Sequence, residues 1–399
     1  MGDEVLDSYY RPTVAEISLD AIERNVKAFR DRMAPGTKLL ASVKANAYGH
    51  GAAETAKSAV AAGADYLGVA FLDEALQLRK AGVTAPVLVL GFTPPEGFEL
   101  ARRHGITLTV YRHEQLDAIE DMAANGPKLK VHVKIDTGMG RLGVLPGPDA
   151  ERFLERVCAM DRIDAEGMFT HYAKADETDK SHSLMQAERF RTVVDYVRRH
   201  SLPLSIIHAG NTAAGIDLPE HAGQMLRLGI GMYGLYPSGE VRKERIALEP
   251  ALTLKTRVVH AKTVQAGESI SYGGRYVASR PESVGTIPVG YADGFSRMLS
   301  GRAEALLRGR KVPVLGTICM DQCMIGLDGV ELGGASPVEP GEEVVLIGRQ
   351  GDEAITAEDV AEKLGTINYE VTCMIAARVP RVYLKGGETV AVSNPITSC

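Results

Sequence analysis

The sequence lacks the features that mark several large classes of protein. No apolar run approaches the roughly 18 residues that span a membrane. The first residues, MGDEVLDSYYRPT, are acidic where a secretory signal needs an apolar segment. A net charge of −6 and a pI near 6.0 give no basic surface for nucleic acid. We therefore expect a cytoplasmic protein that binds neither membranes nor nucleic acid.

Cysteine is scarce as well. The chain has five cysteines, an odd number and widely spaced, which suits reduced thiols better than a disulfide framework. The segment CMDQC brings Cys319 and Cys323 close together, but no second Cys or His pair accompanies them. The ten histidines are scattered and show no metal-ligand spacing. We expect these two cysteines to be buried strand residues, and we predict no metal site.

What the chain does have is length for two domains and an alternating pattern of elements. At 399 residues it is long for a single core. Short apolar segments alternate with amphipathic stretches such as LDEALQLRKAG and MQAERFRTVVDYVRRH. An earlier stretch, AIERNVKAFRDRM, follows Asp20, which we expect to be its N-cap. The eight expected strands are 38–44, 66–70, 86–91, 106–111, 129–135, 163–170, 204–209 and 226–234.

Eight strands alternating with helices predict an α/β protein with a parallel sheet closed into a (β/α)8 barrel of the TIM type. An open, doubly wound sheet is the alternative, but no GxGxxG segment follows the first strand. After about residue 245 the apolar residues alternate with a period of two, and only TAEDVAEKLG looks helical. This pattern predicts a C-terminal, mostly antiparallel β domain. The boundary falls between Pro237 and Glu249, so the predicted domains are 13–245 and 246–399.

Polar residues follow the carboxyl ends of the expected barrel strands, which form the active face of this fold. Each one alone has an ordinary structural explanation, but their convergence is harder to explain that way. The loops AGNTAAG and LGIG, after the last two strands, supply the small residues and the hydroxyl that suit a phosphate site. These strand-end residues are Lys44, Lys134, Asp136, Arg141, His171, His208, Asn211, Thr212, Arg227, Gly229 and Ile230.

Lys44, in the segment SVKANAYGHG, ends an apolar strand and would face that phosphate site. A lysine amine opposite a phosphate site is the arrangement that binds pyridoxal phosphate. A free lysine has a pKa of about 10.4, so only about one in 10³ is neutral at pH 7. Linkage to the cofactor aldehyde as a Schiff base removes that obstacle. We therefore predict that Lys44 is the Schiff-base lysine.

The motifs resemble, in order and over nearly the whole chain, those of the alanine racemase family. The resemblance implies a pyridoxal-phosphate barrel with a β domain, which also takes in residues 1–12. It implies a cytoplasmic homodimer that interconverts L-alanine and D-alanine and supplies D-alanine for peptidoglycan. The matching segments are RPTVAEISLDAIERN, SVKANAYGHG, VKIDTGMGRLG, FTHYAKAD, HAGNTAAG, MLRLGIGMYGLYP, SYGGRY, VGYADG, GTICMDQ and INYEV.

The same resemblance implies residue roles. Lys44 and Tyr272 are the two bases, with Tyr272 entering the partner's barrel. Arg227 faces the pyridine nitrogen, and Arg141 and the backbone of Met320 contact the substrate carboxylate. Lys134 matches a position that is carbamylated in many members and supports Arg141. Further cofactor-binding positions are Tyr48, His171, Asn211, Thr212 (serine in many relatives), Gly229, Ile230 and Tyr369, and further supporting positions are His208, Tyr291 and Asp321.

These residue types suit racemisation. An ionised Tyr272 needs nearby positive charge, for which His171 and Arg227 are the candidates. A guanidinium does not give up its proton, so Arg227 should leave the ring nitrogen unprotonated and disfavour transamination. The related decarboxylases of this fold have an acidic residue there instead. Two cations, Lys134 and Arg141, would repel each other, which favours a carbamylated Lys134 over one paired with Asp136.

Four other functions fit these residues less well. A decarboxylase of the same fold conflicts with Arg227. A non-catalytic pyridoxal-phosphate carrier needs neither the β domain nor Tyr272. A Schiff-base aldolase without a cofactor leaves the phosphate loops unexplained. A racemase of serine or of broader specificity is the nearest alternative, but the bulky Tyr369 and Met320 favour the smaller alanine side chain.

Overall fold

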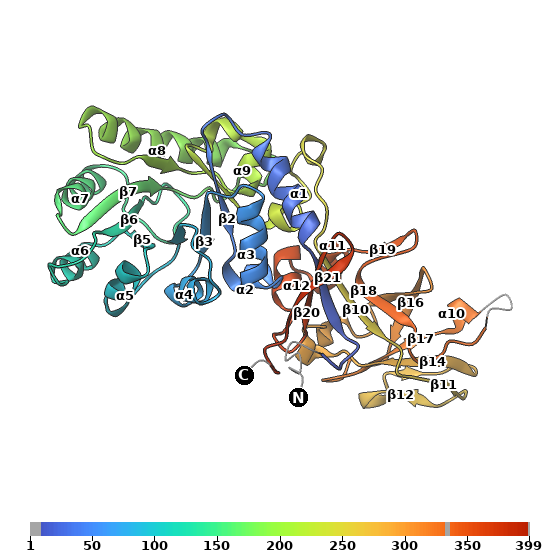
Figure 1. Cartoon of the computed structure of the whole chain (residues 1–399). Coiled ribbons are helices and arrows are strands. Elements are labelled where there is room, and N and C mark those ends of the chain that lie inside the picture. The colour runs from blue at the N-terminus through green and yellow to red at the C-terminus, as the bar shows by residue number, and fades with distance from the viewer. Residues whose placement is uncertain (1–8, 332–335, 398–399) are drawn as a thin grey trace, which may run out of the picture. The chain divides into compact units, whose positions relative to one another are not determined.

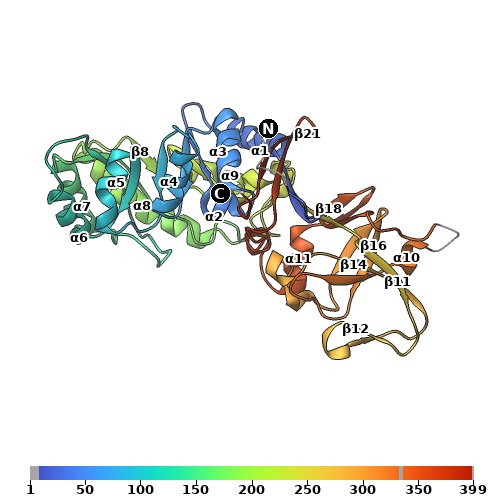
Figure 2. The ribbon, with the colours of Figure 1, turned by 60° about the horizontal axis from the view of Figure 1, so that its bottom comes forward.

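The computed structural model describes residues 9–331 and 336–397, and the chain divides into two compact units. The barrel unit comprises residues 21–47 and 52–249. Of the described residues, the β unit comprises 9–20, 48–51, 250–331 and 336–397. Figure 1 and Figure 2 show strands with helices around them in the barrel unit and a twisted, strand-rich β unit.

The barrel unit contains an eight-stranded sheet in the order β8-β7-β6-β5-β4-β3-β2-β9, with each ladder parallel. The first strand pairs with the last, from Lys38↔Met225 to Ala41↔Leu228, and the other strands pair in chain order, which is the strand order of a barrel. All eight expected strands are present, and the barrel prediction is confirmed. The strands are β2 (Lys38–Ser42), β3 (Tyr66–Val69), β4 (Val87–Val89), β5 (Ile106–Val110), β6 (Leu129–Lys134), β7 (Ile163–Phe169), β8 (Ile206–His208) and β9 (Met225–Leu228).

The expected strand 226–234 is wrong in its second half. β9 ends at Leu228, and the chain turns into the 3-10 helix η3 (Ile230–Tyr233). β8 and β9 form no ladder, and loop backbone closes the gap instead: Arg227 N donates to Gly210 O (3.0 Å). Gly223 lets the segment before β9 pass close to β8, since a Cβ there would lie 2.5 Å from Ile207 O. The closure fixes Arg227 beside the end of β8.

Helices cover the outside of the barrel (Figure 1). The expected helices α4 and α8 are confirmed. α1 begins one residue before Asp20, so Asp20 lies in its first turn and is not the N-cap. No helix among the described residues combines the length and hydropathy needed to cross a membrane. The helices are α1 (Leu19–Arg30), α3 (Ala52–Ala61), α4 (Leu72–Lys80), η1 (Pro95–Gly97), α5 (Phe98–Arg103), α6 (His113–Glu120), α7 (Pro148–Ala159), α8 (Ser181–Arg199), α9 (Thr212–Asp217), η2 (Pro219–His221) and η4 (Lys243–Arg245).

The β unit is built on one large sheet, ordered β11-β14-β17-β16-β15-β18-β10-β1-β20-β21, with β19 paired to β18 and a separate hairpin β12-β13. Among the strands that the structure describes in this unit, only β1 and β20 pair in parallel, which confirms the mostly antiparallel prediction. The strands are β1 (Val14–Ser18), β10 (Leu252–Arg257), β11 (His260–Val264), β12 (Ser269–Ile270), β13 (Tyr276–Val277), β14 (Glu282–Ile287), β15 (Glu304–Leu307), β16 (Arg310–Leu315), β17 (Cys323–Gly326), β18 (Glu343–Gln350), β19 (Glu353–Ile355), β20 (Arg381–Lys385) and β21 (Glu388–Ser393).

The units begin and end at different residues from those predicted. β1 lies between β10 and β20, so the β unit takes in residues 13–20, which were predicted to belong to the barrel. Of the predicted range 1–12, residues 1–8 lie outside the described residues. The alternating apolar residues of β1 suit a sheet with one buried face rather than a barrel strand buried on both faces. The later boundary falls between Glu249 and Pro250.

Short helices complete the β unit: η5 (Tyr272–Gly274), η6 (Tyr291–Asp293), η7 (Arg297–Leu299), α10 (Asp328–Glu331), α11 (Ala357–Leu364) and α12 (Asn368–Cys373). α11 is the expected helix, and Thr356 caps it by accepting from Asp359 N. Cys323 is buried on β17, as predicted. Cys319 instead lies half-buried in the turn before that strand, so its predicted strand position is wrong.

Candidate active site

Lys44 begins a left-handed turn rather than ending a strand. β2 stops at Ser42, and the segment labelled α2 (Lys44–Tyr48) has positive φ angles of 51° at Ala45, 52° at Asn46 and 53° at Ala47. L-residues other than glycine avoid this conformation, which costs about 1–2 kcal/mol per residue. Such strain is typical of functional sites and persists only where surrounding contacts enforce it. The backbone that carries the candidate lysine is therefore strained.

Arg227, on β9, is buried inside the barrel. Its Nη1 donates to His208 Nδ1 (2.8 Å), and its Nη2 donates to His171 Nδ1 (2.9 Å) and to two backbone carbonyls. Burial, with a further contribution from Arg141, lowers the pKa of Arg227 to about 9. The guanidinium is therefore still charged at neutral pH, and four acceptors hold it in place.

Because a guanidinium only donates, the Nδ1 atoms of His171 and His208 must accept. His208 Nε2 can then donate to His132 Nδ1 (2.9 Å), and His132 Nε2 to Glu166 Oε2 (3.1 Å). Burial opposes ionisation of Glu166, yet the hydrogen bond from His132 lowers its pKa to about 2. Sequence reasoning missed His132 and Glu166, although each is a polar residue within an apolar strand segment.

His171 is neutral. Burial, and then the charge of Arg227, lowers its pKa well below the usual value, and Lys134, Arg141 and Lys44 add to the effect. The expectation that His171 supplies positive charge is therefore wrong. Basic residues of the barrel unit thus act together on this one imidazole, with Arg227 in direct contact.

Lys134 is buried, and its Nζ has no hydrogen-bond partner among the described residues. It lies 4.6 Å from the centre of the Phe169 ring. Burial, Arg227 and Arg141 lower the pKa of Lys134 well below its usual value. Asp136 Oδ1 accepts instead from three backbone N–H groups of the following loop. The alternative of a Lys134–Asp136 pair is therefore wrong.

The two loops of the expected phosphate site meet within the barrel unit. Thr212 Oγ1 accepts from Gly229 N (2.9 Å) and lies 3.5 Å from Gly231 N. Asn211 caps the helix that begins at Thr212 by accepting from Ala214 N (3.0 Å). A Cβ on Gly231 would lie 2.7 Å from Thr212 Cγ2. Small residues thus let these backbones approach closely, which suits an anion held by main-chain N–H groups.

In the β unit, the segment 48–51 packs tightly against α12 and β20. The rings of Tyr48 and Tyr369 lie 6.1 Å apart, centre to centre. A Cβ on Gly49 would lie 2.0 Å from Thr372 O, so only glycine fits there.

Tyr272 and Met320 lie on neighbouring turns of the β unit. Tyr272 O accepts from Thr317 Oγ1 (2.9 Å), and the Tyr272 side chain is 73% exposed in the single chain. Met320 O accepts from Ala292 N (3.1 Å), next to Tyr291. The backbone thus fixes these turns, while the tyrosine side chain remains accessible.

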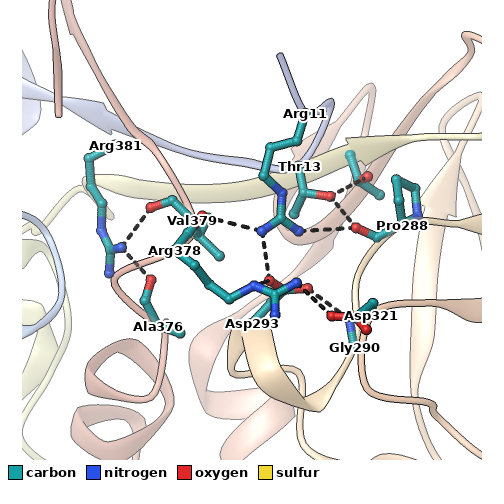
Figure 3. Close-up of polar contacts among 11 residues, drawn as sticks. Arg11, Thr13, Pro288, Gly290, Asp293, Asp321, Ala376, Arg378, Val379 and Arg381 are labelled. Carbon is teal, nitrogen blue, oxygen red and sulfur yellow. Dashed lines mark hydrogen bonds and ion pairs between the residues drawn. The ribbon is translucent and has the colours of Figure 1, made fainter. Parts of the chain in front are cut away.

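A second group of charges, the Asp293 hub (Arg11, Asp293, Asp321 and Arg378), lies next to Met320, since Asp321 follows Met320 and Ala292 N donates to Met320 O. Asp293 is fully buried and pairs with Arg11 Nη1 (2.7 Å) and Arg378 Nε (3.0 Å). Arg378 Nη2 also bonds Asp321 Oδ1 (2.6 Å). Figure 3 shows both arginines converging on Asp293 and Arg378 reaching Asp321. Sequence reasoning did not find Arg11, Asp293 or Arg378.

The predicted site residues therefore fall into two groups, one in each unit. The barrel unit carries Lys44, Lys134, Arg141, His171, His208, Asn211, Thr212, Arg227, Gly229 and Ile230, and the β unit carries Tyr48, Tyr272, Tyr291, Met320, Asp321 and Tyr369.

Comparison with known proteins gives the family. Residues 17–237 match the model of the alanine racemase N-terminal domain, and residues 251–383 match that of the C-terminal domain. The alanine racemase of Halalkalibacterium halodurans is 44% identical over 395 residues, 98% of this chain and 99% of that protein. Alanine racemase 1 of Bacillus subtilis is 44% identical over 391 residues, 97% of each chain.

Among solved structures, alanine racemase from Bacillus anthracis with bound L-Ala-P has a TM-score of 0.92 at 41% identity, covering 98% of this chain and 99% of that one. Its fold and the two relatives agree with the two matched domain models. The family predicted from the motifs is thus confirmed: the chain belongs to the alanine racemase family, whose members are isomerases that depend on pyridoxal phosphate.

Proposed function

We propose that this protein interconverts L-alanine and D-alanine with pyridoxal phosphate held in the barrel unit. The observation that carries the proposal is the group of four basic residues that act on His171, namely Lys44, Lys134, Arg141 and Arg227. Neither of the buried two, Lys134 and Arg227, is paired with a carboxylate among the described residues. A phosphate and an amino-acid carboxylate would balance this excess of positive charge.

The barrel residues fit the cofactor. Thr212, Gly229 and Ile230 would hold the phosphate through N–H groups and the hydroxyl, and Tyr48 and Tyr369 of the β unit would add their hydroxyls. Lys44 would hold the cofactor covalently. When bound, pyridoxal phosphate delocalises the electron pair that remains on the substrate α-carbon after proton removal.

The two bases act on opposite faces of that carbon. Nζ of Lys44 removes or returns the proton on one face, and the Tyr272 hydroxyl does so on the other. The exposure of the Tyr272 side chain supports its use by a second chain in a homodimer with shared sites. With His171 neutral, Arg227 is the remaining candidate to stabilise an ionised Tyr272.

Arg227 would donate a hydrogen bond to the pyridine nitrogen. Even with its pKa lowered to about 9, the guanidinium keeps its proton at neutral pH. It therefore does not protonate the ring, which disfavours transamination relative to racemisation. Arg141 and the Met320 backbone would hold the substrate carboxylate.

Lys134 is proposed to be carbamylated. The reaction joins an unprotonated amine to carbon dioxide and releases one proton, and the lowered pKa of Lys134 favours the unprotonated amine. The resulting anion would attract Arg227 and Arg141, whose charges both act on Lys134. Carbamylation would thus turn a repulsive contact into an attractive one.

The cellular role proposed is supply of D-alanine for peptidoglycan from the cytoplasm. Alanine is favoured over serine because Tyr369 and Met320 are bulky and because the curated relatives named above are alanine racemases.

The test is a racemisation assay. Purified protein loaded with pyridoxal phosphate should convert L-alanine to an equal mixture of enantiomers, and the same mixture should arise from D-alanine. Serine run in parallel should turn over more slowly. Protein that carries the cofactor yet leaves both alanine enantiomers unchanged would refute the proposal.

A further inference from the structure

The left-handed turn after Lys44 needs contacts that keep it in place. Ala45, Asn46 and Ala47 all have φ angles between 51° and 53°. Only asparagine among them tolerates this region well. At about 1–2 kcal/mol per residue, the run would relax unless neighbouring groups opposed it.

Glu74, on α4, makes the contact that explains the turn. Its Oε1 accepts from Ala45 N (2.7 Å), the amide that directly follows Lys44. Its Oε2 accepts from Ala70 N (2.7 Å), at the end of β3, and lies 3.4 Å from Phe71 N. Hydrogen bonds to an ionised carboxylate are roughly twice as strong as neutral ones. One side chain therefore ties the Lys44 turn to the neighbouring strand.

Helix capping does not account for both oxygens. Gln115 occupies the same position of α6, and its single Oε1 accepts from Tyr111 N (2.9 Å) and Arg112 N (3.2 Å). A neutral amide oxygen therefore suffices to cap that helix. In α4, Glu74 has a second oxygen that capping does not need, and this oxygen accepts from Ala45 N.

The other end of the turn is held independently. Asn46 Oδ1 accepts from Ala52 N (2.9 Å), at the start of α3. Ala47 N donates to Val43 O (2.9 Å) across the turn. Glu74 thus controls the lysine end, while Asn46 controls the exit.

We propose that Glu74 is a positioning residue for Lys44: its carboxylate holds the left-handed turn and so aims the Lys44 amine. The proposal rests on the base and anchor role proposed for Lys44. A misplacement of about 1 Å at a reacting group can cost about 10²-fold in rate. The turn, rather than the lysine side chain itself, sets that placement.

Glu74→Gln is the informative variant. Its amide oxygen can still cap α4, as Gln115 caps α6, but its NH₂ group would face Ala45 N, donor against donor. We expect kcat for alanine to fall by about 10- to 100-fold, with KM changed by less than about threefold. Gln115→Ala is the matched control, which should lower thermal stability and leave kcat as in the wild type.

Amide exchange in the cofactor-free protein tests the turn without any activity assay. Glu74→Gln should speed exchange of the Ala45 amide, while Gln115→Ala should not. Adding Ala45→Gly to Glu74→Gln removes strain from an exposed position and should recover part of the lost kcat.

A Glu74→Gln protein with wild-type kcat, or with unchanged Ala45 exchange, would overturn the proposal. Loss of kcat that Ala45→Gly does not restore at all would overturn it too. A wild-type protein without racemase activity would instead refute the proposed function, and the exchange result would still decide whether Glu74 holds the turn.

Discussion

Buried charge is arranged in opposite ways in the two units. In the Asp293 hub, two arginines meet two aspartates, and the buried carboxylate pairs with Arg11 and Arg378. In the barrel unit, Lys134 and Arg227 are buried without a carboxylate in direct contact among the described residues. The charges of the hub are balanced within the chain, whereas the two buried basic groups of the barrel have no acidic partner in contact among the described residues.

The difference indicates which buried charges serve stability and which serve ligand binding. Burying a charge costs several kcal/mol, and a partner in good geometry offsets that cost. The hub has its partners and can serve stability alone. The pKa values of Lys134 and Arg227 are instead lowered, because burial disfavours their charged forms and no carboxylate offsets this effect. Unbalanced buried charge of this kind is typical of sites that bind a ligand of opposite sign.

The largest effect is expected from Lys44→Ala. It removes the cofactor anchor and one base, so kcat should fall by at least about 10³-fold. The free energy of unfolding should change little, because Lys44 is not a core residue. Racemisation assays and chemical denaturation measure the two quantities, with the exposed Lys57→Ala on α3 as the control. Borohydride reduction and peptide mapping should find the cofactor on Lys44, and a label on Lys134 would contradict the assignment.

Unlike Lys44→Ala, Asp293→Asn should act mainly on the stability of the protein. It leaves Arg11 and Arg378 close together without their buried counter-charge, so the free energy of unfolding should fall by about 3–5 kcal/mol. Asp321→Asn breaks only the exposed contact of the same hub and should cost under about 1 kcal/mol. Equal losses in the two variants, measured by urea denaturation, would mean that the hub does not depend on its buried acid.

Lys134→Met tests the barrel unit, where the buried amine of Lys134 has no carboxylate partner among the described residues. Removing an unpartnered buried amine should raise the free energy of unfolding of the carbamate-free protein by about 1–3 kcal/mol at pH 7. The folded-state pKa of Lys134 is depressed, so the unfolded chain binds more protons between that pKa and 10.5. The stability of the wild type should therefore rise with pH in this window, and the advantage of Lys134→Met should shrink.

Bicarbonate provides the control for that variant. If Lys134 is carbamylated, bicarbonate should stabilise the wild type and leave Lys134→Met unchanged, and intact-peptide mass should show the added group. An unmodified amine in bicarbonate at neutral pH would contradict carbamylation. If Lys134→Met is less stable than the carbamate-free wild type, the buried Lys134 amine does not destabilise the barrel unit. The contrast drawn with the Asp293 hub would then be wrong.

Patterns of neighbouring residues in the sequence were enough to predict the barrel. Eight apolar segments predicted the strands in order, and polar residues at their ends predicted most of the barrel part of the site. The same reasoning placed Lys44 at a strand end, but the conformation there is enforced by Glu74, 29 positions from Ala45. Residue types such as alanine give no local signal for a left-handed turn.

Partners far apart in sequence escaped prediction. His132 and Glu166 are 34 positions apart, and Arg11 and Asp293 are 282 apart. Each residue alone is an ordinary polar side chain, and only the folded sheets bring the partners together. β1 was assigned to the barrel for the same reason, because its pairing with β10 spans most of the chain.

The smallest expected departure from wild-type activity is that of mixed dimers. They test which chain supplies each base, Lys44 of the barrel unit and Tyr272 of the β unit. Homodimers of Lys44→Ala and of Tyr272→Ala should each be nearly inactive, since every site lacks one base. If sites are shared in a symmetric dimer, a mixed dimer collects both defects in one site and leaves the other intact. With half of the dimers mixed, one site in four is intact, and activity should recover to roughly a quarter of the wild-type level. If one chain supplied both bases, every site in the mixture would stay defective. Native mass spectrometry can verify subunit exchange, and an inactive mixture after verified exchange would exclude shared sites.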